Sequence, residues 1–102
     1  MPAHADVSAD NAEVRVTAWS FSDGDATGHH RHEYDYVVVP ITDNTFEVVG
    51  DDGSVRELSQ QAGVAYLGVA GTTHDVVNRS GRNAVFVEIE LKRSGAALSS
   101  AT

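Results

Sequence analysis

The sequence predicts an all-β fold, either a sandwich or a closed barrel of short strands. Fifteen of the 102 residues are valine, and runs of strong helix-forming residues are few. β-Branched side chains pack well on a pleated surface and lose rotamer freedom in a helix. Alternating apolar and polar segments are separated by clusters of glycine, asparagine, aspartate and serine. Seven or eight such segments within about eighty residues are typical of small β-sandwiches and barrels.

The strand segments follow one another along the chain with polar turns between them. In VRVTAWSF, Trp19 and Phe21 fall on one face. A single long strand is expected over GHHRHEYDYVVVP, which follows the polar loop SDGDATG. TFEVV and SVREL flank a DDG turn and predict a hairpin. The predicted strands are residues 14–21, 28–40, 45–49, 54–58, 62–69, 74–78 and 84–92.

Length and composition indicate one folded domain. Hydrophobic residues make up 41% of the chain and charged residues 22%, which is ordinary globular usage. Residues 1–10 and 94–102 are small, polar and without periodicity, so we expect flexible tails there. The expected domain covers residues 11–93.

The charge balance and the absence of cysteine exclude several classes of function. Seven basic against fifteen acidic residues give a net charge of −8, the wrong sign for binding nucleic acid or anionic membrane surfaces. No segment approaches the roughly eighteen apolar residues of a membrane span, and we expect a cytoplasmic protein. Without cysteine there is no disulfide or thiolate site, so a metal ion would bind through histidine, carboxylate or phenol.

Three histidines are the candidate metal ligands. His30 and His32 are two positions apart in a predicted strand, so they project to one face about 6.6 Å apart. His74 follows the turn at Gly71 in GTTHDVVN and is the expected third ligand. The alternation directs His29 to the opposite face, as an exposed residue or one that supports a metal ligand without binding the ion. A set of imidazoles suits one divalent ion per chain, whether Fe, Mn, Ni, Cu or Zn.

Tyr36 and Asp35, which follow His32 in the sequence, each have alternative interpretations. Tyr36 shares the histidine face and is the candidate catalytic residue, as hydrogen-bond donor or proton relay, although a strand tyrosine is by default a core residue. Asp35 points away under plain alternation, which makes it an outward carboxylate or one that orients a histidine ring. A bulge after His32 would turn Asp35 into an additional metal ligand.

These motifs resemble those of the cupin superfamily. Gly28, His30 and His32 match the first cupin motif, and the second motif, P-x-G-x-x-H-x-x-x-N, is matched at Gly71, His74 and Asn78 with valine in place of the proline. Two positions depart from the pattern: the glutamate of the first motif falls on Tyr36 or Val37, and its closing glycine falls near Asp43 and Asn44. The stretch YDYVVVP followed by a TD turn is similar to small single-domain cupins labelled β-alanine degradation proteins.

The resemblance implies a cupin double-stranded β-helix, a jelly-roll barrel. It also implies a homodimer formed through outer strands, for which the Val14 and Val16 segment offers a surface. Three neutral imidazoles leave the full charge on a divalent ion, so a small anionic or carbonyl-bearing metabolite is the expected ligand. The resemblance favours a metal-dependent, dioxygenase-like enzyme; the alternatives are a non-catalytic small-molecule-binding or sensing cupin, and a metal-free structural barrel. Neither the metal nor the substrate follows from the sequence.

Overall fold

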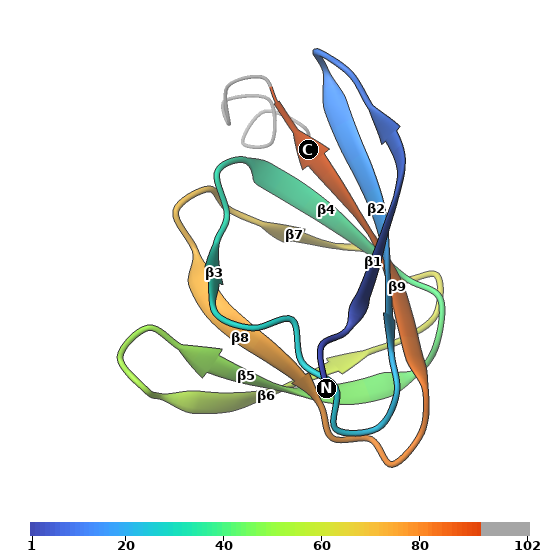
Figure 1. Ribbon diagram of the computed structural model, residues 1–102, viewed down its shortest axis with the longest axis vertical. Helices are drawn as coiled ribbons and strands as arrows, with labels where there is room; N and C mark the ends of the chain where they lie inside the picture. Colours follow the sequence, from blue (N-terminus) through green and yellow to red (C-terminus); the bar gives the residue numbers. More distant parts are fainter. Residues whose placement is uncertain (93–102) are drawn as a thin grey trace.

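The computed structural model describes residues 1–92, which form nine strands in two sheets that face each other (Figure 1). One sheet has the order β1-β2-β9-β4-β7 and the other β3-β8-β5-β6, and every strand pair in them is antiparallel. No helix in this described part is long and apolar enough to cross a membrane. The strands are β1 (His4–Asp10), β2 (Val14–Phe21), β3 (His30–Arg31), β4 (Asp35–Pro40), β5 (Asn44–Gly50), β6 (Val55–Gln60), β7 (Tyr66–Gly68), β8 (Thr73–Asn78) and β9 (Ala84–Leu91).

The core lies between the two sheets and is built around three phenylalanines. Phe21 packs against Phe46 and Phe86, with ring centroids 5.2 and 5.5 Å apart. Directly paired residues of neighbouring antiparallel strands share a face, so Trp19 opposite Phe86 and Thr17 opposite Glu88 also face inward. The predicted common face of Trp19 and Phe21 is thereby confirmed.

The outward face of the five-stranded sheet is also apolar. Val16 lies opposite Ile89 on β9, and Val37 on β4 lies opposite Ile89 from the other side. Two residues further along the same two strands, Val39 on β4 lies opposite Val87 on β9. All of these side chains are half-buried, so both faces of the central strands are hydrophobic.

Two predicted boundaries differ from the structure. Residues 1–10 were expected to be a tail, but β1 pairs with β2 from His4 opposite Ser20 to Asp10 opposite Arg15. Backbone pairing can recruit a polar, exposed segment that has no alternation of its own, because the ladder depends on peptide groups. Of the predicted strand over residues 62–69, only β7 is paired. The predicted C-terminal tail, residues 94–102, lies outside the described residues.

The predicted continuous strand over residues 28–40 is divided between the two sheets. β3 pairs with β8 in the smaller sheet, whereas β4 pairs with β7 and β9 in the larger one. His32 lies in the irregular segment between β3 and β4, where the chain crosses between sheets. A continuous alternation therefore does not extend from His32 to Tyr36, and the shared face predicted for these two residues does not follow from a single strand. The predicted hairpin is confirmed as β5 and β6.

Candidate metal centre and adjoining pocket

The structure brings the three predicted histidines together. His30 on β3 lies directly opposite His74 on β8, and His32 follows β3. The Nε2 atom of His32 lies 3.0 Å from that of His30 and 3.0 Å from that of His74. One ring nitrogen from each residue lies within 4.8 Å of the other two, and no other histidine or carboxylate of residues 1–92 joins this group.

Backbone contacts fix the orientation of the His30 ring and the position of the His32 backbone. The Nδ1–H of His30 donates to the Gly28 carbonyl at 2.8 Å, which leaves Nε2 of that ring as the atom with a free lone pair. The backbone N–H of His32 donates to the Thr72 carbonyl, and its carbonyl accepts from the N–H of Gly71, both at 2.8 Å. Gly71 has a φ of +90°, a conformation that glycine adopts readily, and this turn holds the His32 backbone next to β8.

Burial keeps His32 and His74 neutral over most of the pH range. Burial, followed by the charge of the neighbouring His30, lowers the pKa of each to about 4. A neutral imidazole offers the lone pair that a metal ion requires. His74 Nδ1 is buried without a hydrogen-bond partner among the described residues.

The arrangement fits a first-row divalent ion. Imidazole nitrogens bind such ions at about 2.0–2.1 Å, and two ligands at right angles are then about 3 Å apart. The two Nε2 separations of 3.0 Å agree with this requirement. Three convergent, neutral lone pairs with no acidic residue among them form a donor set suited to Fe, Mn, Ni, Cu or Zn, and His30, His32 and His74 are the residues that would hold the ion.

The Tyr36 ring covers His32. The two rings stack with centroids 4.0 Å apart and an angle of 20° between the planes. Gly68 lies directly opposite Tyr36 on β7, and a Cβ atom on Gly68 would overlap the Tyr36 ring. Burial, followed by the charge of Glu88, raises the pKa of Tyr36 to about 12. Its hydroxyl is therefore protonated at neutral pH and remains a hydrogen-bond donor.

Asp35 is not part of the histidine cluster. It is buried, with 8% of its surface exposed, which corrects the expectation of an outward-facing carboxylate. Its Oδ1 accepts a hydrogen bond from the N–H of Ala70 at 2.7 Å. Because the following residues Gly71 and Thr72 bond to the His32 backbone, Asp35 positions the loop that holds His32.

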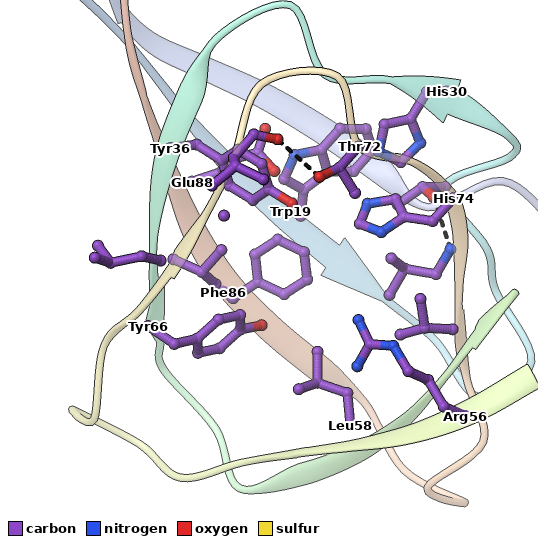
Figure 2. A pocket seen from close by; sticks show the side chains of 17 residues that line it. Trp19, His30, Tyr36, Arg56, Leu58, Tyr66, Thr72, His74, Phe86 and Glu88 are labelled. Carbon is purple, nitrogen blue, oxygen red and sulfur yellow. Dashed lines mark hydrogen bonds between the residues drawn. The ribbon is translucent and has the colours of Figure 1, made fainter. Parts of the chain in front are cut away.

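A cavity of about 350 Å³ adjoins the cluster. His30 and His74 line it, whereas His32 lies behind Tyr36. Figure 2 shows His74 and Arg56 on one side of this space, and Tyr36 and Glu88 on the other. Much of the remaining wall is apolar or aromatic, formed by Trp19, Val38, Val48, Leu58, Tyr66, Val76 and Phe86 among others.

Glu88 and Arg56 are pocket residues that were not predicted from the sequence. Glu88 is 8% exposed, and burial, followed by the like charge of Glu90, raises its pKa to about 7. The signal was present in the alternation of β9, since Glu88 has the same parity as the buried Ala84 and Phe86. Arg56 shares its parity with the inward residues Leu58 and Gln60 at the other end of the barrel wall.

Asn78, the last matched position of the second motif, has a structural role. It is fully buried, and its side-chain NH2 donates to the Ser22 and Arg82 carbonyls. Its Oδ1 accepts hydrogen bonds from the N–H and hydroxyl of Ser80. These contacts join the β8–β9 turn to the loop after β2, away from the three histidines.

Comparison with known proteins agrees with the fold and the motifs. The chain is 50% identical over 86 residues to the β-alanine degradation protein BauB of Pseudomonas aeruginosa, an alignment that spans 84% of this chain and 90% of that protein. A crystal structure of a cupin domain from Bordetella pertussis superposes with a TM-score of 0.86 at 41% identity, covering 90% of this chain and 95% of that domain. The chain belongs to the cupin superfamily.

More distant solved structures share the fold of this cupin. A double-stranded β-helix protein from Klebsiella pneumoniae superposes with a TM-score of 0.74 at 20% identity, covering 89% of this cupin and 77% of that chain. No protein-family model matches the sequence. The predicted cupin double-stranded β-helix is therefore confirmed, and so is the resemblance to the β-alanine degradation group.

Proposed function

We propose that this cupin binds one first-row divalent metal ion per chain through His30, His32 and His74 and acts as a metal-dependent enzyme of the dioxygenase type. The observation that supports the proposal is the convergence of three Nε2 atoms beside a cavity of about 350 Å³. When bound there, the metal would supply Lewis-acid polarisation and, if redox-active, would relay electrons from the substrate to O2. The protein would supply orientation, exclusion of water and proton donors.

A small anionic or carbonyl-bearing metabolite is the proposed substrate. The candidate ligands are all neutral, so the charge of a bound divalent ion is not cancelled by the protein. Arg56 adds a second positive charge to the cavity wall. The name of the Pseudomonas aeruginosa relative refers to β-alanine degradation, which makes short carboxylates and their carbonyl-bearing products the first compounds to test.

Tyr36 is the proposed catalytic residue. It lines the cavity, stacks on a candidate metal ligand and has a protonated hydroxyl at neutral pH. In that position it donates a hydrogen bond to an oxygen of the bound substrate and holds the proton there. A Tyr36→Phe variant keeps the ring stack and removes only this donor.

Elemental analysis tests the metal proposal. The protein is purified without chelator or immobilised metal, beside a His30→Ala/His74→Ala variant and a His29→Ala control. His29 is exposed and outside the cluster, so its removal should leave the metal content unchanged. About one metal per chain in the wild type and control, lost in the double variant, supports the site; equal content in all three, or no uptake on titration, contradicts it.

Oxygen-consumption assays then test the enzyme proposal on metal-loaded protein. Turnover with a short carboxylate or carbonyl compound that decreases in Tyr36→Phe supports it. A loaded site without turnover of any such compound would leave the other candidate, a binding or sensing cupin.

A homodimer is the proposed assembly. Val14 and Val16 lie on the outward face of β2, but β2 is paired on both sides and is not an edge strand. The surface that they contribute is the half-buried apolar face shared with β9 and β4. Two copies could bury this face symmetrically, which is the common arrangement in soluble oligomers.

A further inference from the structure

The cavity contains a buried acid with no cationic partner. Glu88 projects from β9 into the pocket wall and is more than nine-tenths buried. Among residues 1–92 it forms no salt bridge, whereas its neighbour on the same strand, Glu90, pairs with Arg15 at 3.3 Å. A buried charge is normally paired, hydrogen-bonded or used by a ligand.

A buried polar group that lacks a hydrogen-bond partner of normal geometry in residues 1–92 lies beside Glu88. Trp19 Nε1 is buried and has no hydrogen-bond partner of normal geometry in the described part of the chain. Its indole N–H is nevertheless close enough to Glu88 to oppose part of the rise in the pKa of that carboxyl. Trp19 comes from β2 and lines the same cavity, so two strands direct buried polar side chains into one end of it.

Aromatic rings surround this end of the cavity. Trp19, Tyr36, Tyr66 and Phe86 all line it. Burial is the main cause of the raised pKa of both phenols, and the Glu88 charge adds to it. A carboxylate among aromatic faces is a good environment for an organic ammonium group, because the charge pairs with the carboxylate while its C–H and N–H groups contact the rings. A neutral or anionic group would leave Glu88 unpaired.

The other side of the cavity has the opposite charge. The Arg56 guanidinium reaches the pocket below His74, as Figure 2 shows, and forms no ion pair within residues 1–92. A guanidinium binds a carboxylate through two parallel hydrogen bonds. Arg56 and Glu88 therefore give the cavity an anion-binding side and a cation-binding side.

We propose that the pocket binds a small amino-acid zwitterion, with its ammonium group held by Glu88 among the aromatic rings and its carboxylate held by Arg56. This assignment narrows the substrate class of the proposed function and rests on the same pocket, but not on the presence of the metal. A cavity of about 350 Å³ is at the lower end of the range for small-molecule sites, which suits a short amino acid.

NMR titration of the ¹⁵N-labelled protein tests the proposal, because Trp19 is the only tryptophan and its indole N–H signal reports on the Glu88 side. The probes are glycine, 3-aminopropanoate and 4-aminobutanoate, compared with propanoate and propylamine, which each lack one charged group. The titrations use metal-free and Zn²⁺-loaded protein at pH 8, where Glu88 is mostly ionised. The variants are Glu88→Gln and Arg56→Gln, with Glu57→Gln, an exposed residue outside this cavity, as the matched control.

The proposal expects at least one zwitterion to shift the Trp19 indole signal and to bind about tenfold or more tightly than propanoate and propylamine. Glu88→Gln should lower the affinity for that zwitterion by about tenfold without changing the affinity for propanoate. Arg56→Gln should lower the affinity for both compounds. No binding of any zwitterion, or equal binding in wild type and Glu88→Gln, overturns it. Zinc content measured on the same samples separates this result from the metal proposal, which stands or falls on the histidine variants.

Discussion

The Tyr36 ring occupies the space that a side chain on Gly68 would fill. The two residues are directly opposite each other on β4 and β7, and the ring that passes over Gly68 stacks on His32. The position of a glycine on an edge strand therefore decides how the tyrosine lies against the candidate metal centre. Gly68 does not have a positive φ, so its backbone conformation does not require a glycine. A glycine is required there because a side chain would overlap the Tyr36 ring.

Gly68→Ala should destabilise the protein by about 1–3 kcal/mol, because the new methyl group overpacks the site and displaces the ring. Urea unfolding of the variant measures the loss. Leu67→Ala on the same strand is the control, since Leu67 is 58% exposed and should cost much less. In a Tyr36→Ala background most of the Gly68→Ala penalty should disappear; an undiminished penalty there would show that the ring is not the cause.

Metal binding should stabilise the folded protein. A ligand that binds only the folded state raises the free energy of unfolding with concentration, by about 2.7 kcal/mol at one hundred times its Kd. Thermal unfolding with added Mn²⁺ or Zn²⁺ should therefore show a higher Tm in the wild type and in His29→Ala. The Tm of His30→Ala/His74→Ala should not respond, and a response equal to that of the wild type would place the ion elsewhere.

Replacing Asp35 should weaken metal binding without removing a ligand. Asp35→Ala leaves the Ala70 N–H without its acceptor, which costs about 1–3 kcal/mol and loosens the loop that holds His32. Asp43→Ala is a matched control, because Asp43 accepts a similar bond from the Ala62 N–H, also at 2.7 Å, outside the histidine cluster. Zinc affinity should fall in the Asp35 variant alone. Unchanged affinity in both would exclude a positioning role for Asp35.

Glu88 should make the metal-free protein less stable as pH rises from about 4.5 to about 7. Its pKa is raised from 4.5 to about 7 in the folded state, so the unfolded chain releases this proton first and stability falls across that window. Glu88→Gln should remove the effect, a difference on the order of 3 kcal/mol between pH 4 and pH 8. Comparing unfolding curves of the two proteins cancels the opposite contribution of His32 and His74, which are common to both. If the free energy of unfolding changed with pH in the same way in the wild type and in Glu88→Gln, the raised pKa of Glu88 would be contradicted.

The outward apolar face should mediate self-association. Val87→Lys places a charge in the centre of that face and should shift sedimentation velocity profiles from dimer to monomer. Val55→Lys is the control, because Val55 is already 59% exposed on β6. A wild-type protein that sediments as a monomer at all concentrations would remove the dimer proposal.

Local pattern was enough to predict the fold class and the three histidines. The β-branched composition, the period of two and the glycine turns act over short distances, so VRVTAWSF is β2 from its first residue to its last. The motif spacing likewise brought His30, His32 and His74 to one place, because β3 and β8 pair directly. Glu88 could have been found in the same way, as an acid at a buried position of an alternating strand.

Contacts between distant segments decided the rest. The crossing of the chain between sheets at His32 brings Tyr36 onto that ring, and no local pattern marks where a strand leaves one sheet for another. The polar segment of β1 is a strand only because β2 offers it a backbone ladder. The sequence by itself determined which side chains are available for chemistry, since residue type and period are local properties. Only the tertiary structure decided which of them share a cavity, because packing between the two sheets sets Arg56, Glu88, His30 and His74 around one space.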